Sequence, residues 1–317
     1  MKSSPPAPVE RQYHALRSGG GLVELTGWSR VTLTGSDRQS FLQNFCTNDV
    51  KRLAPGQSCE AFFTNVKGKI VGHGLVSCRE DEIIILGVPD QAPRLIEHLD
   101  RYVIREEVQL RDTTAEWSYL LGTGANIARE LAGVVSSEGR SAATGRSPIS
   151  WNLVGSTDCW LFEIAPPSMS LVLRSLSERG FVVAGAEVFD TARIEAGTPL
   201  FGVDFDERNL PQEVGRNEQA ISFTKGCYLG QETVARIDAL GHVNQQLAGL
   251  RFHGTEVPQG GAMLTHNGKA AGHVTSATTS PQLASPLALA MLRREYTAAG
   301  TQLESPAEPC EVVALPV

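Results

Sequence analysis

The order of apolar patterns between residues 117 and 183 constrains the fold of this chain more than any other sequence feature. Short or alternating apolar runs predict strands at 117–121, 150–154, 159–164 and 181–183, and helical spacing predicts helices at 125–131 and 168–178. A Ser/Gly/Arg-rich loop is expected at about 135–147. The resulting order, β-α-β-β-α-β, is typical of a ferredoxin-like α+β unit.

The residues before this unit repeat the same kind of pattern. Strands are predicted at 30–34, 59–65, 69–77, 82–88 and 108–110, with helices after Ser36-Asp37 and near 91–103. We therefore predict an α+β protein with two such units side by side, at 22–115 and 116–241.

The two ends of the chain have a different texture. From about residue 242 short strands alternate with turns that contain Gly and Pro, which favours a C-terminal β-barrel over 242–317. The first 20 residues are rich in Ser, Pro and Gly, so residues 1–21 are expected to form a disordered tail.

Charge and composition exclude several classes of protein. The formal net charge of −7 disfavours general nucleic-acid binding. The longest β-like apolar run, 83–88, is far short of the roughly 20 residues that a membrane span needs. None of the six cysteines has C-x-x-C spacing, so no metal site is encoded locally, and without a signal peptide we expect reduced cysteines in a cytoplasmic protein.

The segment Lys225–Glu232, K-G-C-Y-L-G-Q-E, carries the chemistry of this chain. Gly226 and Gly230 bracket Cys227 and allow a sharp turn. Residues 231–240 have helical composition with Gly241 as C-terminal cap, so Cys227 precedes a helix start, and Lys225 is two residues away. Both features favour a thiolate at Cys227. A small buried residue in a tight turn is the alternative, and both interpretations stay open at this level.

The same segment resembles the signature K-G-C-Y-x-G-Q-E of YgfZ-type folate-binding proteins, which are related in fold to the T-protein of glycine cleavage. Further elements that resemble this family are R-I-E-A-G at 193–197 with Pro199, P-Q-E at 211–213, T-N-D-V at 47–50, K-G-K at 67–69 and 272–276 with Pro281. The resemblance implies two ferredoxin-like units and a C-terminal barrel around a central channel that holds tetrahydrofolate.

The resemblance also implies a function and a set of site residues. Members of the family support assembly or repair of iron–sulfur clusters, so transient partners would be iron–sulfur client or assembly proteins, with Cys227 as the essential thiol and Lys225 beside it. Glu195 would read the pterin edge, and Trp28 and Phe189 would lie against the folate. Tyr228 and Gln231 are assigned to the same site, and Arg236, Lys67 and Lys69 are candidates for the anionic glutamyl tail.

One departure from the T-protein bears on the reaction. Aminomethyltransferases have K-G-G-I-x-D-D where this chain has K-G-K-I-V-G-H at 67–73, so His73 replaces the aspartate that polarises the reacting amine. We therefore expect no glycine-cleavage activity. A one-carbon transferase or demethylase that uses His73 or Asp49 as a base is an alternative. A dinucleotide-binding enzyme, suggested by G-T-G at 122–124, is a weaker one because Ile127 stands at the third glycine position.

Overall fold

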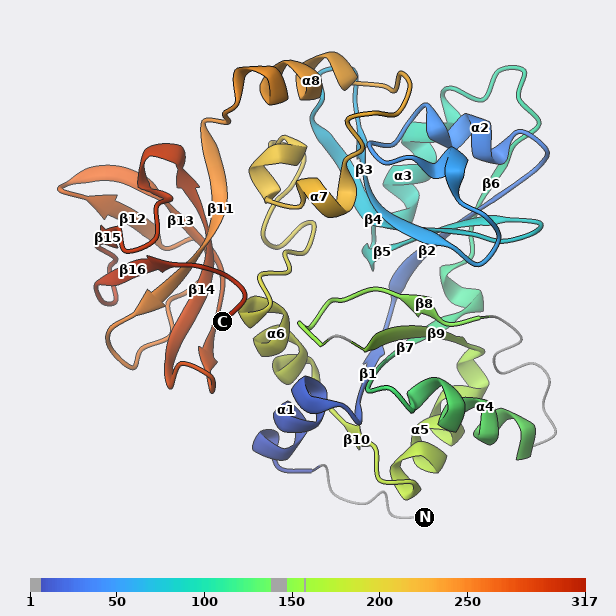
Figure 1. The fold of residues 1–317 in the computed structure, drawn as a ribbon, viewed down its shortest axis with the longest axis horizontal. Coiled ribbons are helices and arrows are strands. Elements are labelled where there is room, and N and C mark those ends of the chain that lie inside the picture. Colours follow the sequence, from blue (N-terminus) through green and yellow to red (C-terminus); the bar gives the residue numbers. More distant parts are fainter. Residues whose placement is uncertain (1–6, 138–146, 157) are drawn as a thin grey trace.

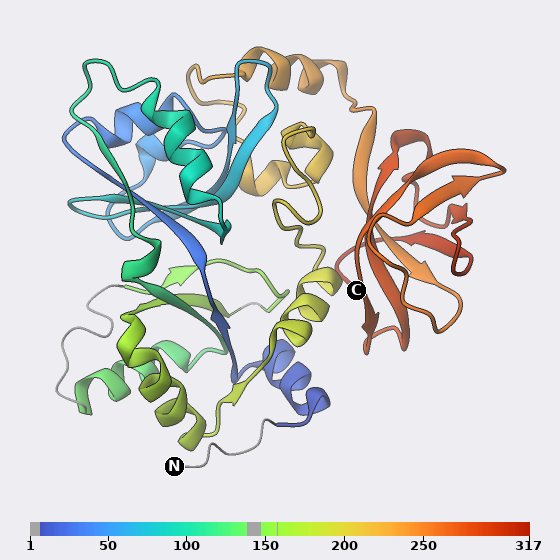
Figure 2. The same cartoon turned by 180° about the vertical axis from the view of Figure 1, so that it is seen from behind.

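The computed structural model describes residues 7–137, 147–156 and 158–317, which form two α+β units and a β-barrel joined by a helical connection (Figure 1). The predicted fold class is confirmed. Seen from either side, the two units stand one above the other and the barrel lies beside them (Figure 2). The end of the chain reaches back from the barrel to the middle of the molecule, next to α6 (Ala186–Glu195).

The first unit is a five-stranded antiparallel sheet in the order β3-β4-β5-β2-β6. Its strands are β2 (Trp28–Thr34), β3 (Ser58–Thr64), β4 (Ile70–Cys78), β5 (Ile83–Pro89) and β6 (Gln109–Asp112). Two helices, α2 (Arg38–Gln43) and α3 (Ala92–Asp100), bury their apolar residues against the sheet. The strands and helices predicted for this segment are therefore present.

The second unit has the predicted β-α-β-β-α-β order, with one strand added. Its elements are β7 (Ser118–Thr123), α4 (Ile127–Ser137), β8 (Ile149–Ser150), β9 (Cys159–Ile164), α5 (Met169–Glu178) and β10 (Val182–Val183). The added strand, β1 (Gly21–Leu25), lies between β7 and β10. The second unit therefore takes a strand from the segment assigned to the first. Most of the loop expected at 135–147 lies outside the described residues.

The disordered tail expected at 1–21 is wrong for most of its length. Residues 1–6 lie outside the described residues, but α1 (Val9–Ser18) is a helix whose Tyr13 and Leu16 are buried. These two residues are three apart and share one face, which packs on the second sheet and α6. Composition alone hid this short amphipathic pattern.

The neighbours of β7 exclude the dinucleotide-binding alternative. Both β1 and β9 pair with β7 in antiparallel fashion, whereas a Rossmann turn needs a parallel β-α-β unit.

A helical connection leads from the second unit to the barrel. It contains α6, a 3-10 helix at Pro211–Val214, α7 (Asn217–Ala220) and α8 (Gln231–Leu240). Gly241 ends α8 in the left-handed conformation (φ 73°), so the predicted helix and its glycine cap are confirmed. In Figure 1, α8 spans the space between the first unit and β11 (Gln245–Phe252), the first strand of the barrel.

The barrel is a six-stranded antiparallel sheet in the order β12-β13-β14-β11-β16-β15. Its further strands are β12 (Met263–His266), β13 (Lys269–Ser280), β14 (Ser285–Arg293), β15 (Gln302–Leu303) and β16 (Cys310–Val313). An antiparallel bridge between Thr265 and Glu304 joins the two ends of the sheet and closes it.

Buried ion pairs between side chains hold the two α+β units together. The Nε of Arg30 lies 3.0 Å from Glu163 Oε1, and Arg79 Nη2 lies 3.1 Å from Glu163 Oε2. Arg30 is 1% exposed, so this contact is desolvated and fixes how the two sheets meet.

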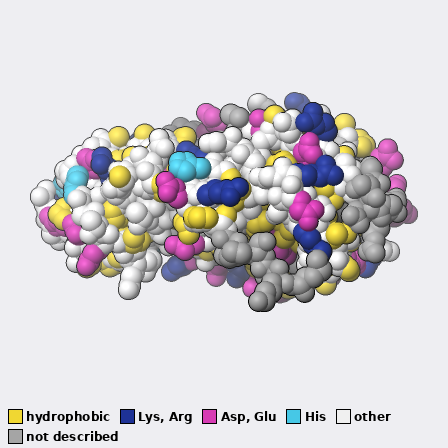
Figure 3. Space-filling view, turned by 90° about the horizontal axis from the view of Figure 1, so that it is seen from below, with side chains coloured by type: hydrophobic (Ala, Val, Ile, Leu, Met, Phe, Trp, Pro, Cys, Tyr) yellow, Lys and Arg dark blue, Asp and Glu magenta, His cyan; other side chains and the backbone are white. Residues whose placement is uncertain are grey.

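The molecular surface carries both signs of charge. On the face in Figure 3 the coloured basic and acidic side chains are interspersed and form no continuous basic stripe. Among the described residues no helix is both long enough and apolar enough to cross a membrane.

Candidate functional site

The turn that carries Cys227 is built on close contact with another turn. Gly230 has φ 82°, and a Cβ there would lie 2.5 Å from the carbonyl oxygen of Asn65 and 2.9 Å from the Cα of Gly68. Only glycine fits such an approach. Gly226 is under no such constraint, because a Cβ there would meet nothing within 4 Å. One of the two bracketing glycines is therefore required by the geometry.

Cys227 differs from the other cysteines in its exposure. Its side chain is exposed, Cys59 is partly shielded, and the remaining four are buried. Burial raises the pKa of Cys46 and Cys159 to about 11 and that of Cys59 and Cys310 to about 12. These four thiols are therefore neutral at physiological pH, and Cys227 is the cysteine with an exposed thiol.

Lys225 anchors this turn through its ammonium group. The Nζ donates hydrogen bonds to the carbonyl oxygens of Gln43 (2.7 Å), Cys46 (2.6 Å) and Asn48 (2.8 Å). It also lies 5.0 Å from the centre of the Tyr228 ring. Burial lowers the pKa of Lys225, while Cys46 and Asp49 oppose that shift. Among the described interactions Lys225 binds the 43–48 turn rather than the sulfur of Cys227.

The other predicted site residues of the segment are spread over α8 and the core. Tyr228 is buried beside Phe62, Ile70 and Phe205. Gln231 is the first residue of α8 and is half-buried, and Arg236 lies on its exposed side. The side chain of Tyr228 is therefore buried in the core, whereas that of Arg236 is exposed.

Two predicted aromatic residues meet near the centre of the molecule. The rings of Trp28 and Phe189 are 6.4 Å apart at 75°, and Trp28 and Trp151 are 5.8 Å apart at 80°. All three are buried. They form edge-on contacts with one another, which aromatic pairs favour over face-to-face stacking.

Glu195 is fully buried, and protein groups occupy its carboxylate. The hydroxyl of Tyr13 donates to Oε2 (2.6 Å), and the hydroxyl of Ser280 donates to Oε1 (2.5 Å). Arg17 Nε is 3.8 Å from Oε2. Burial and the hydrogen bond to Glu195 hold the pKa of Tyr13 well above its usual range. Glu195 thereby ties α6 to α1 and to the barrel strand β13.

A second buried carboxylate, Glu60, lies where the two α+β units meet the helical connection. Its Oε1 accepts from His73 Nε2 (2.9 Å) and Arg216 Nε (2.8 Å), and its Oε2 accepts from Arg216 Nη2 (2.6 Å) and Trp151 Nε1 (3.0 Å). Burial alone would raise the pKa of Glu60, but hydrogen bonds from Arg216 and His73 hold it well below its usual range. Glu60 is therefore a fixed carboxylate with four donors.

His73 is held in the same cluster. Its ring packs against those of Phe62 and Phe205, with centroid distances of 4.7 and 5.5 Å. The strand register pairs His73 with Phe62, which puts Glu60 and His73 diagonally opposite on one face of the sheet. The position of the transferase aspartate thus carries a packed imidazole bound to a carboxylate. Asp49, the other base candidate, binds Gln43 and Arg52 in a different turn.

A cavity of about 470 Å³ lies next to this cluster, between the connection and the barrel. Its walls include Arg216, Gln219 of α7, Gln246 of β11 and the C-terminal residues Leu315 and Pro316. Cys227 is not one of its lining residues. Arg216 lines the cavity and binds Glu60. Glu60 in turn accepts a hydrogen bond from Trp151, which packs on Trp28. The sequence-based site missed Glu60 and Arg216, although the register of two neighbouring strands could have placed Glu60 beside His73.

Comparison with known proteins gives the class first. A crystal structure of the glycine cleavage system aminomethyltransferase T from Bartonella henselae has the same fold, with a TM-score of 0.84 and 18% identity over 100% of this chain and 91% of that one. The model of the GCVT N-terminal domain matches residues 3–165, and that of the glycine cleavage T-protein C-terminal barrel domain matches residues 245–317.

The chain therefore belongs to the glycine cleavage T-protein family. It is similar to the aminomethyltransferase of a Nostoc species, with 28% identity over 93% of this chain and 83% of the relative. It is also similar to a putative chloroplastic transferase of Arabidopsis thaliana, with 25% identity over 90% of this chain and 68% of the relative. The predicted relation to the T-protein is confirmed, whereas the narrower YgfZ-type assignment stays a prediction. Aminomethyltransferases of this family use tetrahydrofolate.

Proposed function

We propose that this chain binds tetrahydrofolate in the cavity between the connection and the barrel, and that it supports the assembly or repair of iron–sulfur clusters in other proteins through the thiol of Cys227. The exposure of Cys227 carries the proposal. It is the one exposed thiol among the six cysteines, and it lies on a turn that Lys225 and Gly230 hold in place. A thiol in such a position suits transient contact with a client or assembly protein.

The cavity between the connection and the barrel fits a folate in size and chemistry. Its volume of about 470 Å³ lies in the range of small-molecule sites. The amides of Gln219 and Gln246 offer both donors and acceptors, as the edge of a pterin requires, and Leu315 gives an apolar wall. The guanidinium of Arg216 would lie beside the anionic part. When bound, tetrahydrofolate supplies a carrier for one-carbon units.

The residues assigned from the resemblance take different parts in this proposal. Trp28 does not line the cavity. It packs on Trp151, which donates a hydrogen bond to Glu60, and Phe189 packs on Trp28. Glu195, whose carboxylate is bound by Tyr13 and Ser280, lies directly before Ala196 and Gly197 in the cavity wall. The buried ring of Tyr228 would hold the turn of Cys227 on the core. Gln231 and Arg236 would contribute through α8, on which they lie.

The cluster around Glu60 favours an accessory role over aminomethyl transfer. An aminomethyltransferase needs a free carboxylate beside the reacting amine. Here His73 stands in that position, and the nearby carboxylate of Glu60 is already neutralised by Arg216. The chain is expected to release no ammonia from an aminomethylated carrier protein. We also propose a cytoplasmic location, in keeping with six free cysteines.

The test is a complementation experiment in cells that lack the protein. Wild type, Cys227→Ala and the matched control Cys59→Ala are expressed at equal levels, and the activity of an iron–sulfur enzyme is measured in extracts. The expected result is loss of support with Cys227→Ala alone. Full support by that variant would show that the thiol is not required.

One-carbon transfer to or from an unidentified acceptor is the second candidate, and the names of the relatives favour it. His73 would be its base, oriented by the hydrogen bond to Glu60. A screen of small methylamines for turnover of tetrahydrofolate distinguishes the two. Turnover that His73→Asn abolishes and Cys227→Ala leaves unchanged would select this candidate.

A further inference from the structure

A cavity of about 660 Å³ lies where the 202–209 loop of the helical connection meets strands β12, β13 and β14 of the barrel. Three of its lining residues carry groups that bind metal ions, namely Met263, His273 and Met291. We call it the methionine cavity. It shares no lining residue with the cavity proposed for folate, so a ligand in it is independent of that function.

The strand register places these three side chains in one row. His273 of β13 lies directly opposite Met263 of β12 on one side and directly opposite Met291 of β14 on the other. Residues directly opposite in an antiparallel sheet point to the same face, with Cβ atoms about 4.5–5.5 Å apart. Their strand neighbours Leu264 and Val274 belong to the apolar core of the barrel, so the row points outward, into the cavity.

The row runs from the surface inward. Met263 is 57% exposed, whereas Met291 is 3% exposed and belongs to the same apolar cluster as Phe205. The imidazole of His273, between them, makes no hydrogen bond with any described residue, so a ring nitrogen is free to bind an ion. Methionine is unbranched and flexible, and its sulfur adjusts to the geometry of a ligand. Solvent therefore reaches one end of the row, while packing holds the other.

The ligand set of this row is soft. Imidazole binds copper among several metals, and thioether sulfur selects soft ions such as Cu(I). Zinc sites use thiolate, imidazole and carboxylate instead of thioether. The two carboxylates of the cavity are already bound, because Asp204 accepts from Arg193 (2.8 Å) and Asp206 accepts from Arg208 (2.6 Å). Hard cations therefore find no free carboxylate among the lining residues, and Cu(I) fits the row best.

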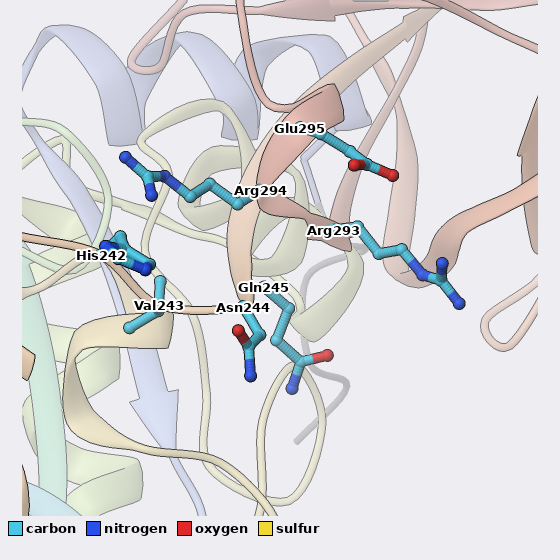
Figure 4. Close-up of a pocket in the computed structure, with 7 residues that line it drawn as sticks. All are labelled: His242, Val243, Asn244, Gln245, Arg293, Arg294 and Glu295. Atoms are coloured by element: carbon cyan, nitrogen blue, oxygen red, sulfur yellow. The ribbon is translucent and has the colours of Figure 1, made fainter.

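A neighbouring cavity of about 730 Å³ shows the contrast (Figure 4). Gln245 lines both cavities. The other side chains of the neighbouring cavity end in nitrogen, oxygen or carbon and carry no sulfur, namely those of His242, Val243, Asn244, Arg293, Arg294 and Glu295. A soft cation there would find a single imidazole and two guanidinium groups, so the soft ligands lie in the methionine cavity.

We propose that the methionine cavity binds a Cu(I) ion through the sulfurs of Met263 and Met291 and a ring nitrogen of His273. The three ligands come from neighbouring strands, so the ion links β12, β13 and β14 where the 202–209 loop meets the barrel. The site takes up copper without the thiol of Cys227, which is not among its lining residues.

Anaerobic titration of Cu(I) against a competing chromophoric chelator tests this site. The full chain carries Cys227→Ala, because an exposed thiol also binds Cu(I), and further substitutions are made in that background. The background protein is expected to bind one equivalent of Cu(I). Met263→Leu and His273→Asn should each weaken Cu(I) binding by at least about tenfold, a loss that even an outer partner of a metal ligand causes. X-ray absorption at the copper edge should show sulfur and nitrogen neighbours, with fewer sulfur neighbours in Met263→Leu.

Met169→Leu and His253→Asn are the matched controls. Met169 lies in α5 of the second unit, and His253 is an exposed barrel residue outside the cavity, so both variants should bind Cu(I) as the background protein does. Thermal melting without copper identifies a variant that does not fold, and Met263→Leu, at an exposed position, then gives the test. Absence of Cu(I) binding in the background protein would overturn the proposal. So would binding that Met263→Leu and His273→Asn leave unchanged, or copper with no sulfur neighbour.

Discussion

Replacement of Arg216 by Met removes the cation that neutralises Glu60 and leaves a chain of similar length. The two hydrogen bonds between them, at 2.8 and 2.6 Å, join side chains that are 14% and 5% exposed. Removal of one partner of a buried ion pair costs about 3–5 kcal/mol. Because Glu60 keeps donors from His73 and Trp151, we expect a loss of about 2–4 kcal/mol in the free energy of unfolding at pH 7.

The pH dependence of this loss identifies its cause. In the wild type the pKa of Glu60 lies below its unfolded value, so its contribution to stability is present above about pH 4.3 and is lost as the pH falls further. In the variant the buried carboxylate of Glu60 has lost its cation, so burial raises its pKa, and uptake of a proton by Glu60 stabilises the folded state as the pH falls. The difference in free energy of unfolding between variant and wild type is therefore largest at pH 7 and becomes smaller toward pH 5.

Urea denaturation at pH 7 and pH 5 measures both quantities. Arg208→Met is the control, because Arg208 makes a similar forked contact with Asp206 on the surface, where it is 83% exposed. That variant should stay within about 0.5 kcal/mol of wild type. An equally small effect of Arg216→Met, or a large effect with no pH dependence, would refute the assignment of Glu60 as a buried charge held by Arg216.

Three further predictions concern the turn and the buried carboxylate. Gly230→Ala should lower the free energy of unfolding by at least about 2 kcal/mol in a urea titration, because of the positive φ and the contact with Asn65. Gly226→Ala should change that free energy by less than about 1 kcal/mol, and equal effects of the two variants would contradict the account of the turn. Tyr13→Phe should cost about 1.5–3 kcal/mol through the lost hydrogen bond to Glu195, measured against Tyr102→Phe as control, and a loss no larger than the control's would count against it. Iodoacetamide at neutral pH should label Cys227 first, as read by mass spectrometry, since burial raises the pKa of Cys46, Cys59, Cys159 and Cys310; labelling of Cys46 at the same rate would be inconsistent with its burial.

The sequence predicted most of the fold because local periodicity governs it. The apolar spacing of Leu95 and Leu99 marked α3, and Gly241 marked the end of α8. The tail and β1 were missed for a different reason. Tyr13 and Leu16 are buried by α6 and the second sheet, which are distant in sequence. β1 joins its sheet through strands about 100 and 160 residues away. A local sequence pattern cannot predict contacts between segments so far apart.

The candidate site was predicted less completely, because closeness in sequence does not determine the direction in which a side chain points. Lys225 is two residues from Cys227, yet its ammonium binds the carbonyl groups of the 43–48 turn. Glu195 was assigned to a ligand, yet Tyr13 of α1 and Ser280 of β13 occupy its carboxylate. Arg216 escaped notice since its partner, Glu60, is 156 residues away.

Titration of tetrahydrofolate into the purified chain tests the shared basis of both candidate functions most directly. Wild type and Cys227→Ala are expected to bind one equivalent with equal affinity, because Cys227 does not line the cavity between the connection and the barrel. Gln219→Met, which removes an amide from that cavity, should bind about tenfold more weakly, and the exposed control Gln259→Met should bind as wild type does. Absence of saturable binding, or equal affinity of Gln219→Met and wild type, would contradict the placement of the folate.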